Sequence, residues 1–280
     1  EYSFGAMKTP SGLALTTTVV GVDNANPTGN GTGAVSINMT ATNAITYNID
    51  FGDGNIALVP SGKITYKYTT PGVAKYTITV NAIGTGGIIS TMSKAVTVFV
   101  AFEIPTTILT NLTGSGSKVW IADKAAPGHF GVGPGPSQGA NETFFPSWYA
   151  AGPNDRAADG FYDDEITFSK DANNNVSINL DNKGNTFVLG AAVSYYSLTG
   201  AEGQFPIVTS GVKRLSFMNA TSNSTAAVST RIQFSVPGNG LVMVGAGSNM
   251  YEIISITSTT MTLRTIGADG NAWYQMFKVK

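Results

Sequence analysis

Short runs that alternate apolar and polar residues, separated by Gly, Asn, Asp and Pro, dominate the chain. In KYTITVNAI (75–83), Tyr76, Ile78 and Val80 alternate with polar residues, so they share one face of an extended strand. Helical periodicity is nearly absent. Comparable β-branched runs recur along the first hundred residues: ALTTTVVGV, AVSINMT, AITYNIDF, KITYKYTT and KAVTVFVAF. This rhythm of strands and turns predicts an all-β protein built of antiparallel β-sandwiches.

The alternation breaks near residues 102–107. The run VTVFVAF ends a strand, and Glu103-Ile104-Pro105 interrupts the pattern. The chain has 280 residues, whereas a typical domain has roughly 100–200. We therefore predict two sandwich domains, residues 1–102 and the larger 103–280.

The first domain carries a recognisable turn. Asp50-Phe51-Gly52-Asp53-Gly54 follows a strand, and Asp53-Gly54 favours a tight turn; Tyr66, Tyr68, Pro71-Gly72 and the strand 76–80 come after it. This order, over residues 10–101, resembles the PKD family of small immunoglobulin-like sandwiches. Phe51 stands where Trp is common, and Thr79-Val80 replaces the usual leucine-containing end. The resemblance implies a spacer domain. We expect Asp50 and Asp53 to shape the turn; a calcium ion bound there is the alternative.

The composition of the chain argues against several classes of function. Charged residues make up 12% of the chain and the net charge is −1, so no basic face for nucleic acid is predicted. No stretch approaches the roughly 20 apolar residues of a membrane span. The chain has no cysteine, which excludes disulfides and cysteine-ligated metal sites.

The second domain combines further strands with a long irregular passage at 124–163. Passages longer than about 12–15 residues are uncommon unless they are functional or disordered, and the aromatic content of this one argues against disorder. The predicted strands are SKVWIAD, EITFSK, NVSINL, VKRLSFM, STRIQFSV, YEIISITS, TMTLRTIG and AWYQMFKV. The passage contains His129, Phe130, Phe144, Phe145, Trp148, Tyr149 and Phe161.

Two adjacent aromatic pairs, Trp148-Tyr149 and Trp273-Tyr274, suggest a binding surface. Neighbours on an extended backbone point to opposite faces, so one member of each pair faces a surface or groove. Flat aromatic rings cover the apolar C–H faces of sugars, and polar side chains meet the hydroxyl groups. The alternative is that these aromatic side chains bury one another in a small hydrophobic core of the passage itself. The predicted carbohydrate-binding residues are Trp148, Trp120, Trp273, Tyr149, His129, Asn154 and Asp155.

The carboxylate run Asp163-Asp164-Glu165 raises the alternative of a glycoside hydrolase. Hydrolysis needs two carboxyl groups about 5–5.5 Å or 6.5–9.5 Å apart across a sugar. Asp163 and Glu165 on one strand face would lie about 6–7 Å apart at the backbone, but the chain shows no nucleophile elbow or triad. We predict no catalytic residues and no enzyme activity. His129, the only histidine, lacks the partners of a metal site. We expect no cofactor, with a structural calcium ion left open.

A second resemblance covers the binding domain. The segments KVW (118–120), APGHFGVGP (126–134), PSWYAAGPN (146–154) and YDDE (162–165), and the ending 251–280, resemble the C-terminal module of surface glycan-binding lipoproteins of Bacteroidetes. These proteins occupy the SusE/SusF position beside SusC/SusD-type uptake systems, often with a PKD-like spacer.

This resemblance implies a PKD-like immunoglobulin-fold domain followed by a larger carbohydrate-binding-module-like sandwich. It implies a monomer at the cell surface, an outward-facing outer-membrane lipoprotein whose lipid-bearing Cys precedes Glu1. Its partners would be a polysaccharide or oligosaccharide, with β-glucans a frequent target, and SusC/SusD-type transporter components. The runner-up is a structural or adhesion module that binds protein, which a broad apolar patch would favour.

Overall fold

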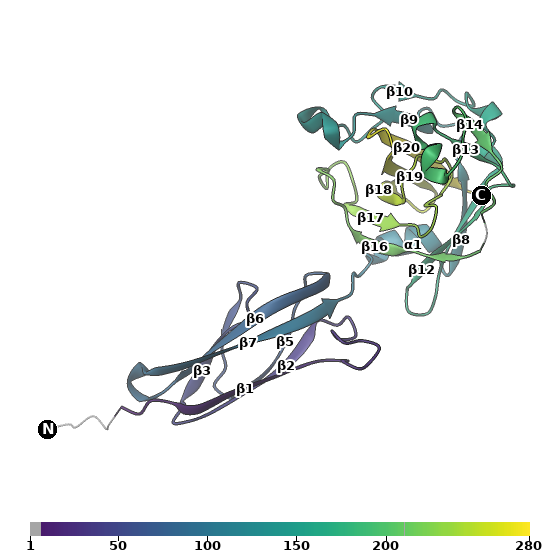
Figure 1. Ribbon diagram of the computed structural model, residues 1–280. Coiled ribbons are helices and arrows are strands. Elements are labelled where there is room, and N and C mark those ends of the chain that lie inside the picture. Colours follow the sequence, from purple (N-terminus) through teal and green to yellow (C-terminus); the bar gives the residue numbers. More distant parts are fainter. Residues whose placement is uncertain (1–6, 210) are drawn as a thin grey trace. The chain divides into compact units, whose positions relative to one another are not determined.

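The computed structural model describes residues 7–209 and 211–280, and the chain divides into two compact units. Unit 1 is Glu1–Glu103 and unit 2 is Ile104–Lys280. The division falls one residue after the 102/103 boundary expected from the break in alternation. Figure 1 shows that both units are built mainly of strands, which confirms the all-β fold class.

Unit 1 contains two antiparallel sheets. The first has the strand order β1-β2-β5, and the second β4-β3-β6-β7. The strands are β1 (Ser11–Val19), β2 (Ala34–Thr42), β3 (Thr46–Asp50), β4 (Ile56–Leu58), β5 (Lys63–Lys67), β6 (Gly72–Ile83) and β7 (Ile89–Val100); the short 3-10 helix η1 (Thr85–Gly87) joins the last two.

The core of unit 1 lies between these sheets, as the alternation predicted. Ile78 and Val80 of β6 are fully buried and Tyr76 is half-buried. Thr77, which lies between Tyr76 and Ile78, is exposed. Val35 and Ile37 of β2 come from the other sheet into the same apolar cluster. Burial of one face from each sheet is the defining feature of a sandwich.

The Asp-Phe-Gly-Asp-Gly segment forms a structural turn. The carboxylate of Asp50 accepts the Gly52 N–H at 2.8 Å, and that of Asp53 accepts the Tyr66 hydroxyl at 2.7 Å. Phe51 is buried and stacks on Tyr66 with ring centroids 3.7 Å apart. The backbone oxygen of Phe51 accepts the buried Tyr68 hydroxyl at 2.8 Å. The turn aspartates thus bind groups of their own unit, which is the structural role that their sequence suggested.

Unit 2 is organised around one large antiparallel sheet. Its strand order is β15-β12-β11-β8-β20-β19-β18-β17-β16, with β9 and β10 as an added arm; β13 and β14 pair separately. The strands are β8 (Ser117–Ala122), β9 (Phe130–Gly133), β10 (Tyr149–Ala150), β11 (Glu165–Lys170), β12 (Val176–Asp181), β13 (Thr186–Val188), β14 (Gly203–Phe205), β15 (Lys213–Arg214), β16 (Ser216–Asn219), β17 (Ile232–Ser235), β18 (Met250–Ile256), β19 (Thr260–Ile266) and β20 (Ala272–Val279).

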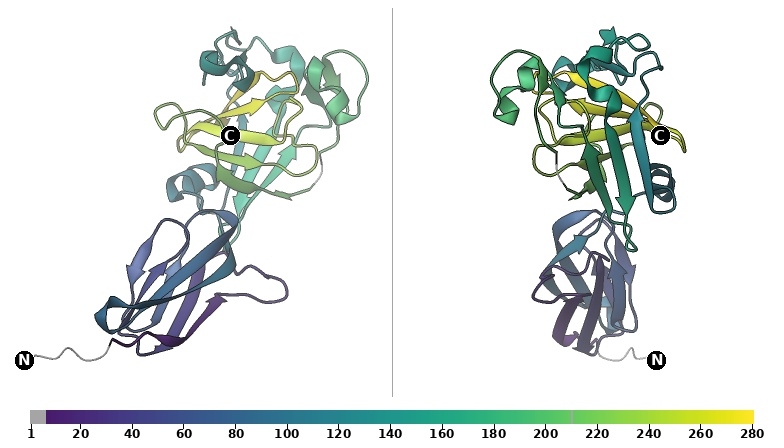
Figure 2. Two further views of the ribbon diagram at one scale, coloured as in Figure 1. Left: turned by 60° about the vertical axis from the view of Figure 1, so that its left-hand side comes forward. Right: turned by 90° about the vertical axis from the view of Figure 1, so that its right-hand side faces the viewer.

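This sheet curves until its two halves face each other, and Figure 2 shows the curvature from two sides. Phe168 on β11 and Phe234 on β17 are five strands apart in the sheet order, yet their ring centroids are 6.0 Å apart. Both side chains are fully buried, together with Trp120 of β8 and Tyr251 of β18. The curved sheet therefore encloses a core as a sandwich does.

One strand, β20, divides one of its edges between two partners. Residues 277–279 pair with β8, and residues 272–275 pair with β9. β9 in turn pairs with β10, which has no further neighbour among the described strands. The long passage 124–163 is therefore partly ordered as an arm of the sheet, and β10 is its edge. It also contains the 3-10 helices η2 (Pro136–Asn141), η3 (Ala157–Asp159) and η4 (Phe161–Asp163).

Helices are short. α1 (Thr106–Thr113) is the one α-helix of the described residues, and the 3-10 helices η5 (Gly190–Ala192) and η6 (Ser194–Tyr196) lie between β13 and β14. Ile108, Leu109 and Leu112 of α1 are buried. The strand-rich pattern did not predict α1, because eight residues are too few for a clear helical period. No helix within 7–209 and 211–280 has the length and apolarity of a membrane span.

Candidate functional site

The edge arm of unit 2 carries most of the exposed aromatic residues. Among large hydrophobic side chains in the described part of the chain, only four aromatic ones are exposed, and three of these lie within five residues. Phe145 is 61% exposed, Trp148 is 55% exposed and Tyr149 is 40% exposed. We call this stretch, residues 145–149, the aromatic segment.

Backbone pairing fixes the aromatic segment on the sheet. Tyr149 lies opposite Val132 of β9, and the Trp148 N–H donates to the Val132 oxygen at 3.0 Å. Gly131 and Gly133 allow this close approach. A Cβ on Gly131 would lie 2.4 Å from the Tyr149 oxygen, and one on Gly133 would lie 2.8 Å from the Phe145 oxygen. The glycines of the HFGVG run therefore let the aromatic segment lie directly over β9.

The segment that precedes the aromatic residues is anchored to the sheet by polar contacts. The Tyr274 hydroxyl donates to the backbone oxygen of Thr143 at 2.7 Å. Glu142 pairs with the buried guanidinium of Arg264, which also lies 4.9 Å from the centre of the Phe144 ring. These contacts hold the approach to the aromatic segment in place while its rings remain open to solvent.

The polar residues Asn154 and Asp155, which were predicted to bind sugar hydroxyls, are also exposed. Asn154 adopts a positive φ of 65°, which Asn tolerates better than most residues, and its N–H donates to the Lys124 oxygen at 2.8 Å. Asp155 accepts the Gly152 N–H at 2.8 Å through one carboxylate oxygen. Both side chains lie at the surface after β10, so the chain presents aromatic and polar groups within ten residues.

Trp273 is only partly available. It is half-buried on β20, and its ring stacks on Phe130 with centroids 5.4 Å apart. Its indole N–H lies 3.2 Å from each carboxylate oxygen of Asp269. Phe130 thus covers part of the Trp273 ring, so a ligand has less access to this ring than to Trp148 or Tyr149.

Two predicted site residues are core residues, and their assignment to a surface was wrong. Trp120 is fully buried on β8, a strand with neighbours on both sides, and its indole N–H donates to the Leu112 oxygen of α1 at 3.0 Å. His129 is fully buried; its Nδ1 lies 2.9 Å from the Ala126 oxygen and its Nε2 lies 2.5 Å from the Tyr162 hydroxyl. Neither ring can reach a ligand at the surface.

The carboxylates at 163–165 occupy different environments. Asp164 is buried without a hydrogen-bond partner among the described residues, and burial raises the pKa of its carboxyl group to about 8. Glu165 pairs with Lys280 at 2.7 Å, and this hydrogen bond lowers its pKa. Asp163 ends η4 and Asp164 lies between η4 and β11, so Asp163 and Glu165 do not form the expected pair on one strand face. Within 7–209 and 211–280, no cluster of three or more His, Asp or Glu side chains could hold a metal ion.

Comparisons with solved structures return distant similarities, of which three are described below. No family model matches the chain, and no curated protein matches it. The PKD1 domain of Vibrio anguillarum Epp is 17% identical and covers 34% of this chain and 99% of its own, with a TM-score of 0.26. The PKD1 domain of the Vibrio cholerae metalloprotease PrtV is 19% identical and covers 32% of this chain and 95% of its own, with a TM-score of 0.24.

A third solved structure represents carbohydrate-binding modules of the β-sandwich superfamily. It is 12% identical and covers 97% of this chain and 91% of its own, with a TM-score of 0.27. At such scores the likenesses carry no argument of their own. The fold assignment rests on the strand pairing and buried faces described above.

Proposed function

We propose that the chain is a non-catalytic carbohydrate-binding protein, in which unit 2 binds a polysaccharide or oligosaccharide and unit 1 is a PKD-like spacer. The observation that carries this proposal is the exposure of Phe145, Trp148 and Tyr149 at and just before the edge strand β10, followed by the exposed polar side chains of Asn154 and Asp155. Exposed rings offer flat apolar faces to the C–H faces of sugars, and the polar groups suit their hydroxyls.

The resemblance of unit 2 to the Bacteroidetes glycan-binding lipoproteins extends the proposal. In that setting the protein is a monomer at the cell surface, held there by a lipid anchor that is not part of this chain. It captures glycan, with β-glucans the first class to test, and passes it to SusC/SusD-type transporter components.

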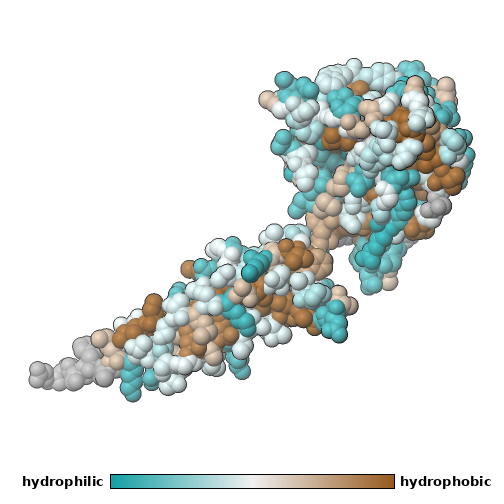
Figure 3. All heavy atoms as spheres, viewed as in Figure 1, coloured by the Kyte–Doolittle hydropathy of each residue, from teal (hydrophilic) through white to brown (hydrophobic). Residues whose placement is uncertain are grey.

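Protein binding is the competing function. Figure 3 shows hydrophobic residues in several groups on the visible face, separated by polar residues. The exposed aliphatic residues of unit 1 include Ile56, Leu58 and Val73. Scattered apolar residues of this kind are normal on a protein surface, whereas an interaction surface needs a contiguous patch. The aromatic segment therefore favours the glycan.

The direct test is affinity electrophoresis of the whole chain in gels that contain soluble β-glucans, mannans or xylans. At least one polysaccharide should retard the protein, and Trp148→Ala should weaken this retention. By analogy with base–aromatic stacking, one ring contributes about 1–3 kcal/mol, or roughly 5- to 150-fold in affinity. The matched control is Ile56→Ala, which removes an exposed apolar side chain from unit 1 and should leave retention unchanged. Equal retention of wild type and a folded Trp148→Ala variant would contradict the role of the aromatic segment, and no retention of the wild type by any polysaccharide would contradict the proposal.

A further inference from the structure

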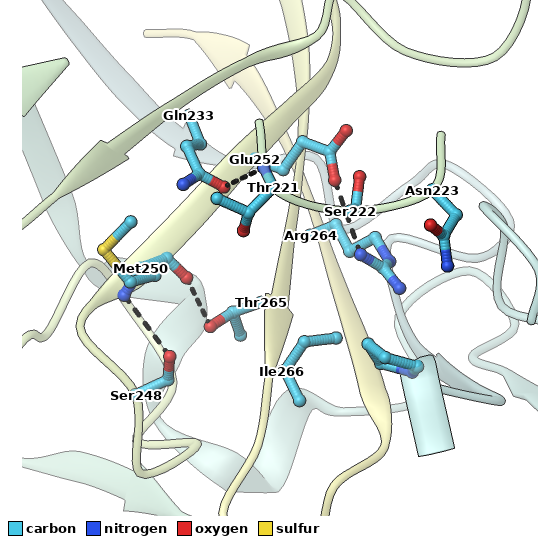
Figure 4. A pocket seen from close by; sticks show the side chains of 11 residues that line it. Thr221, Ser222, Asn223, Gln233, Ser248, Met250, Glu252, Arg264, Thr265 and Ile266 are labelled. Atoms are coloured by element: carbon cyan, nitrogen blue, oxygen red, sulfur yellow. Dashed lines mark hydrogen bonds and ion pairs between the residues drawn. The ribbon is translucent and has the colours of Figure 1, made fainter. Parts of the chain in front are cut away.

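A second polar site lies on the sheet of unit 2, outside the aromatic segment. A pocket of about 150 Å³ opens between β17, β18, β19 and the loop that follows β16. Figure 4 shows its polar and apolar groups around a common space. Its hydroxyl and amide side chains include those of Thr221, Ser222, Asn223, Gln233 and Ser248, and its apolar ones include Met250 and Ile266.

A rigid network of paired charges forms one wall of the pocket. The buried Arg264 pairs with Glu252 at 3.4 Å and with Glu142. Glu252 also accepts the hydroxyls of Ser224 at 2.5 Å and Ser229 at 2.6 Å. Because each carboxylate already has a cationic or hydroxyl partner, the wall offers no free charge to an ionic ligand.

The loop that closes the pocket is fixed by a second guanidinium. Arg231 donates to the backbone oxygens of Ser222 and Ala220, at 2.7 and 2.8 Å, and to the Ser224 hydroxyl at 2.7 Å. The Thr221 N–H donates to the Gln233 side-chain oxygen at 3.2 Å. The pocket is therefore held open by backbone and salt-bridge contacts that involve neither the Thr221 hydroxyl nor the Ile266 side chain.

One polar atom of this wall forms no hydrogen bond within the described part of the chain. Arg264 Nε is buried and has no partner among the described residues. That atom is enclosed within the wall, so the hydroxyl and amide groups of the lining, and not Arg264 Nε, are the partners open to a ligand. The hydroxyl groups of a sugar both donate and accept hydrogen bonds, and the hydroxyl and amide side chains that line the pocket can serve as their partners.

We infer that this pocket is a subsite for one neutral sugar ring, an inference that rests on the proposed glycan-binding function. A cavity of about 150 Å³ is large enough for a single six-membered ring. The described residues of the wall leave no charged group without a partner, which favours a neutral ring over a charged one. Met250 and Ile266 give its C–H groups apolar contacts, and the hydroxyl and amide groups meet its hydroxyls.

The pocket is also close enough to the aromatic segment for one oligosaccharide to occupy both. Cα partners run in one row from Tyr149 through Val132 and Trp273 to Thr265, which lines the pocket. Three strand spacings of about 4.8 Å separate the ends of this row by about 14 Å. The aromatic segment then supplies affinity for the chain, and the pocket selects one unit of it.

The experiment titrates the whole protein with methyl glucoside, methyl mannoside and methyl xyloside by ligand-observed NMR. At least one glycoside should bind, and glucuronate should bind more weakly than its neutral counterpart. Thr221→Phe fills the pocket but retains the backbone bond to Gln233, so it should abolish glycoside binding. Thr221→Ala should weaken binding about 2- to 10-fold through loss of one hydroxyl contact. Thr259→Phe, at an exposed threonine in the β18–β19 turn at the far end of the hairpin, should change nothing.

Two outcomes would overturn the subsite: no glycoside binds the wild type, or one binds Thr221→Phe as it binds the wild type. The Trp148→Ala variant keeps this result separate from the proposed function. If Trp148→Ala loses polysaccharide retention while Thr221→Phe retains the polysaccharide and wild type binds no glycoside, the glycan-binding function stands and the pocket is not part of it. If no polysaccharide retards the wild type, the proposed function itself is wrong.

Discussion

Tyr149 and Trp273 lie in one cross-strand row, separated by a single residue, Val132 of β9. The two rings differ in what surrounds them. Tyr149 is on the edge strand and is 40% exposed, whereas Trp273 is on an inner strand and packs against Phe130. Position within the sheet, more than the residue type, therefore decides which ring a ligand can touch.

Trp120 and Trp148 should respond in opposite ways to truncation. Trp120→Ala removes a fully buried ring and should lower the free energy of unfolding by about 3–5 kcal/mol. Trp148→Ala removes a ring that is mostly in solvent and should change it by no more than about 0.5 kcal/mol. Chemical denaturation of both variants measures this difference. A large loss of stability in Trp148→Ala would make Trp148 a packing residue and would remove its role as a platform.

Asp164 should make stability depend on pH. Its folded pKa of about 8 lies above the value of 3.8 expected when unfolded, so between these values the folded state holds a proton that the unfolded state has released. The free energy of unfolding should therefore fall as pH rises from about 4 to about 8, by up to about 1.4 kcal/mol per pH unit.

The variant Asp164→Asn isolates this effect. It should melt at a higher temperature than wild type at pH 9 and at a similar temperature at pH 4, because below pH 4 the wild-type carboxyl is protonated in both states. Melting curves across this range, in the presence of EDTA, measure the difference between the two proteins. Parallel curves for wild type and variant would show that the Asp164 carboxyl is ionised in the fold.

Two glycines of the unit 1 turn offer a matched pair of substitutions. Both have positive φ, +79° for Gly52 and +90° for Gly54, so alanine should cost about 1–2 kcal/mol at either position. A Cβ on Gly52 would also lie 2.5 Å from the Thr77 oxygen, whereas one on Gly54 would meet nothing within 4 Å. Gly52→Ala should therefore destabilise the protein by a further 1–3 kcal/mol, roughly the cost of overpacking. Equal melting temperatures for the two variants would contradict this account.

The purified chain should release no reducing sugar from any glycan that it binds. Asp164 is enclosed and Glu165 is paired with Lys280, so neither is placed to act on a bound sugar with the other. Incubation with each retained polysaccharide, followed by a reducing-end assay, tests this expectation. Turnover that disappears in Asp164→Asn or Glu165→Gln would show that the protein is a hydrolase.

Local sequence patterns determined the strands, the unit 1 turn and part of the site. Alternation at Tyr76, Ile78 and Val80 gives a strand with one apolar face wherever a second sheet covers it, since the side-chain period of two is a property of the extended backbone. The exposure of one ring of the Trp148-Tyr149 pair was predicted from the same rule. Neighbouring large rings on extended backbone cannot both enter one core, and here both are exposed at an edge.

Tertiary structure decided which aromatic rings are covered and which polar residues meet. Trp120 sits on a strand between β11 and β20 and beneath α1, and nothing in its neighbours along the chain distinguishes it from a surface tryptophan. In the sequence, the polar residues of the pocket wall are isolated on three separate strands: Gln233, Glu252 and Arg264. They form one pocket wall because strand register places them opposite one another, and register depends on pairing between segments that are far apart in sequence.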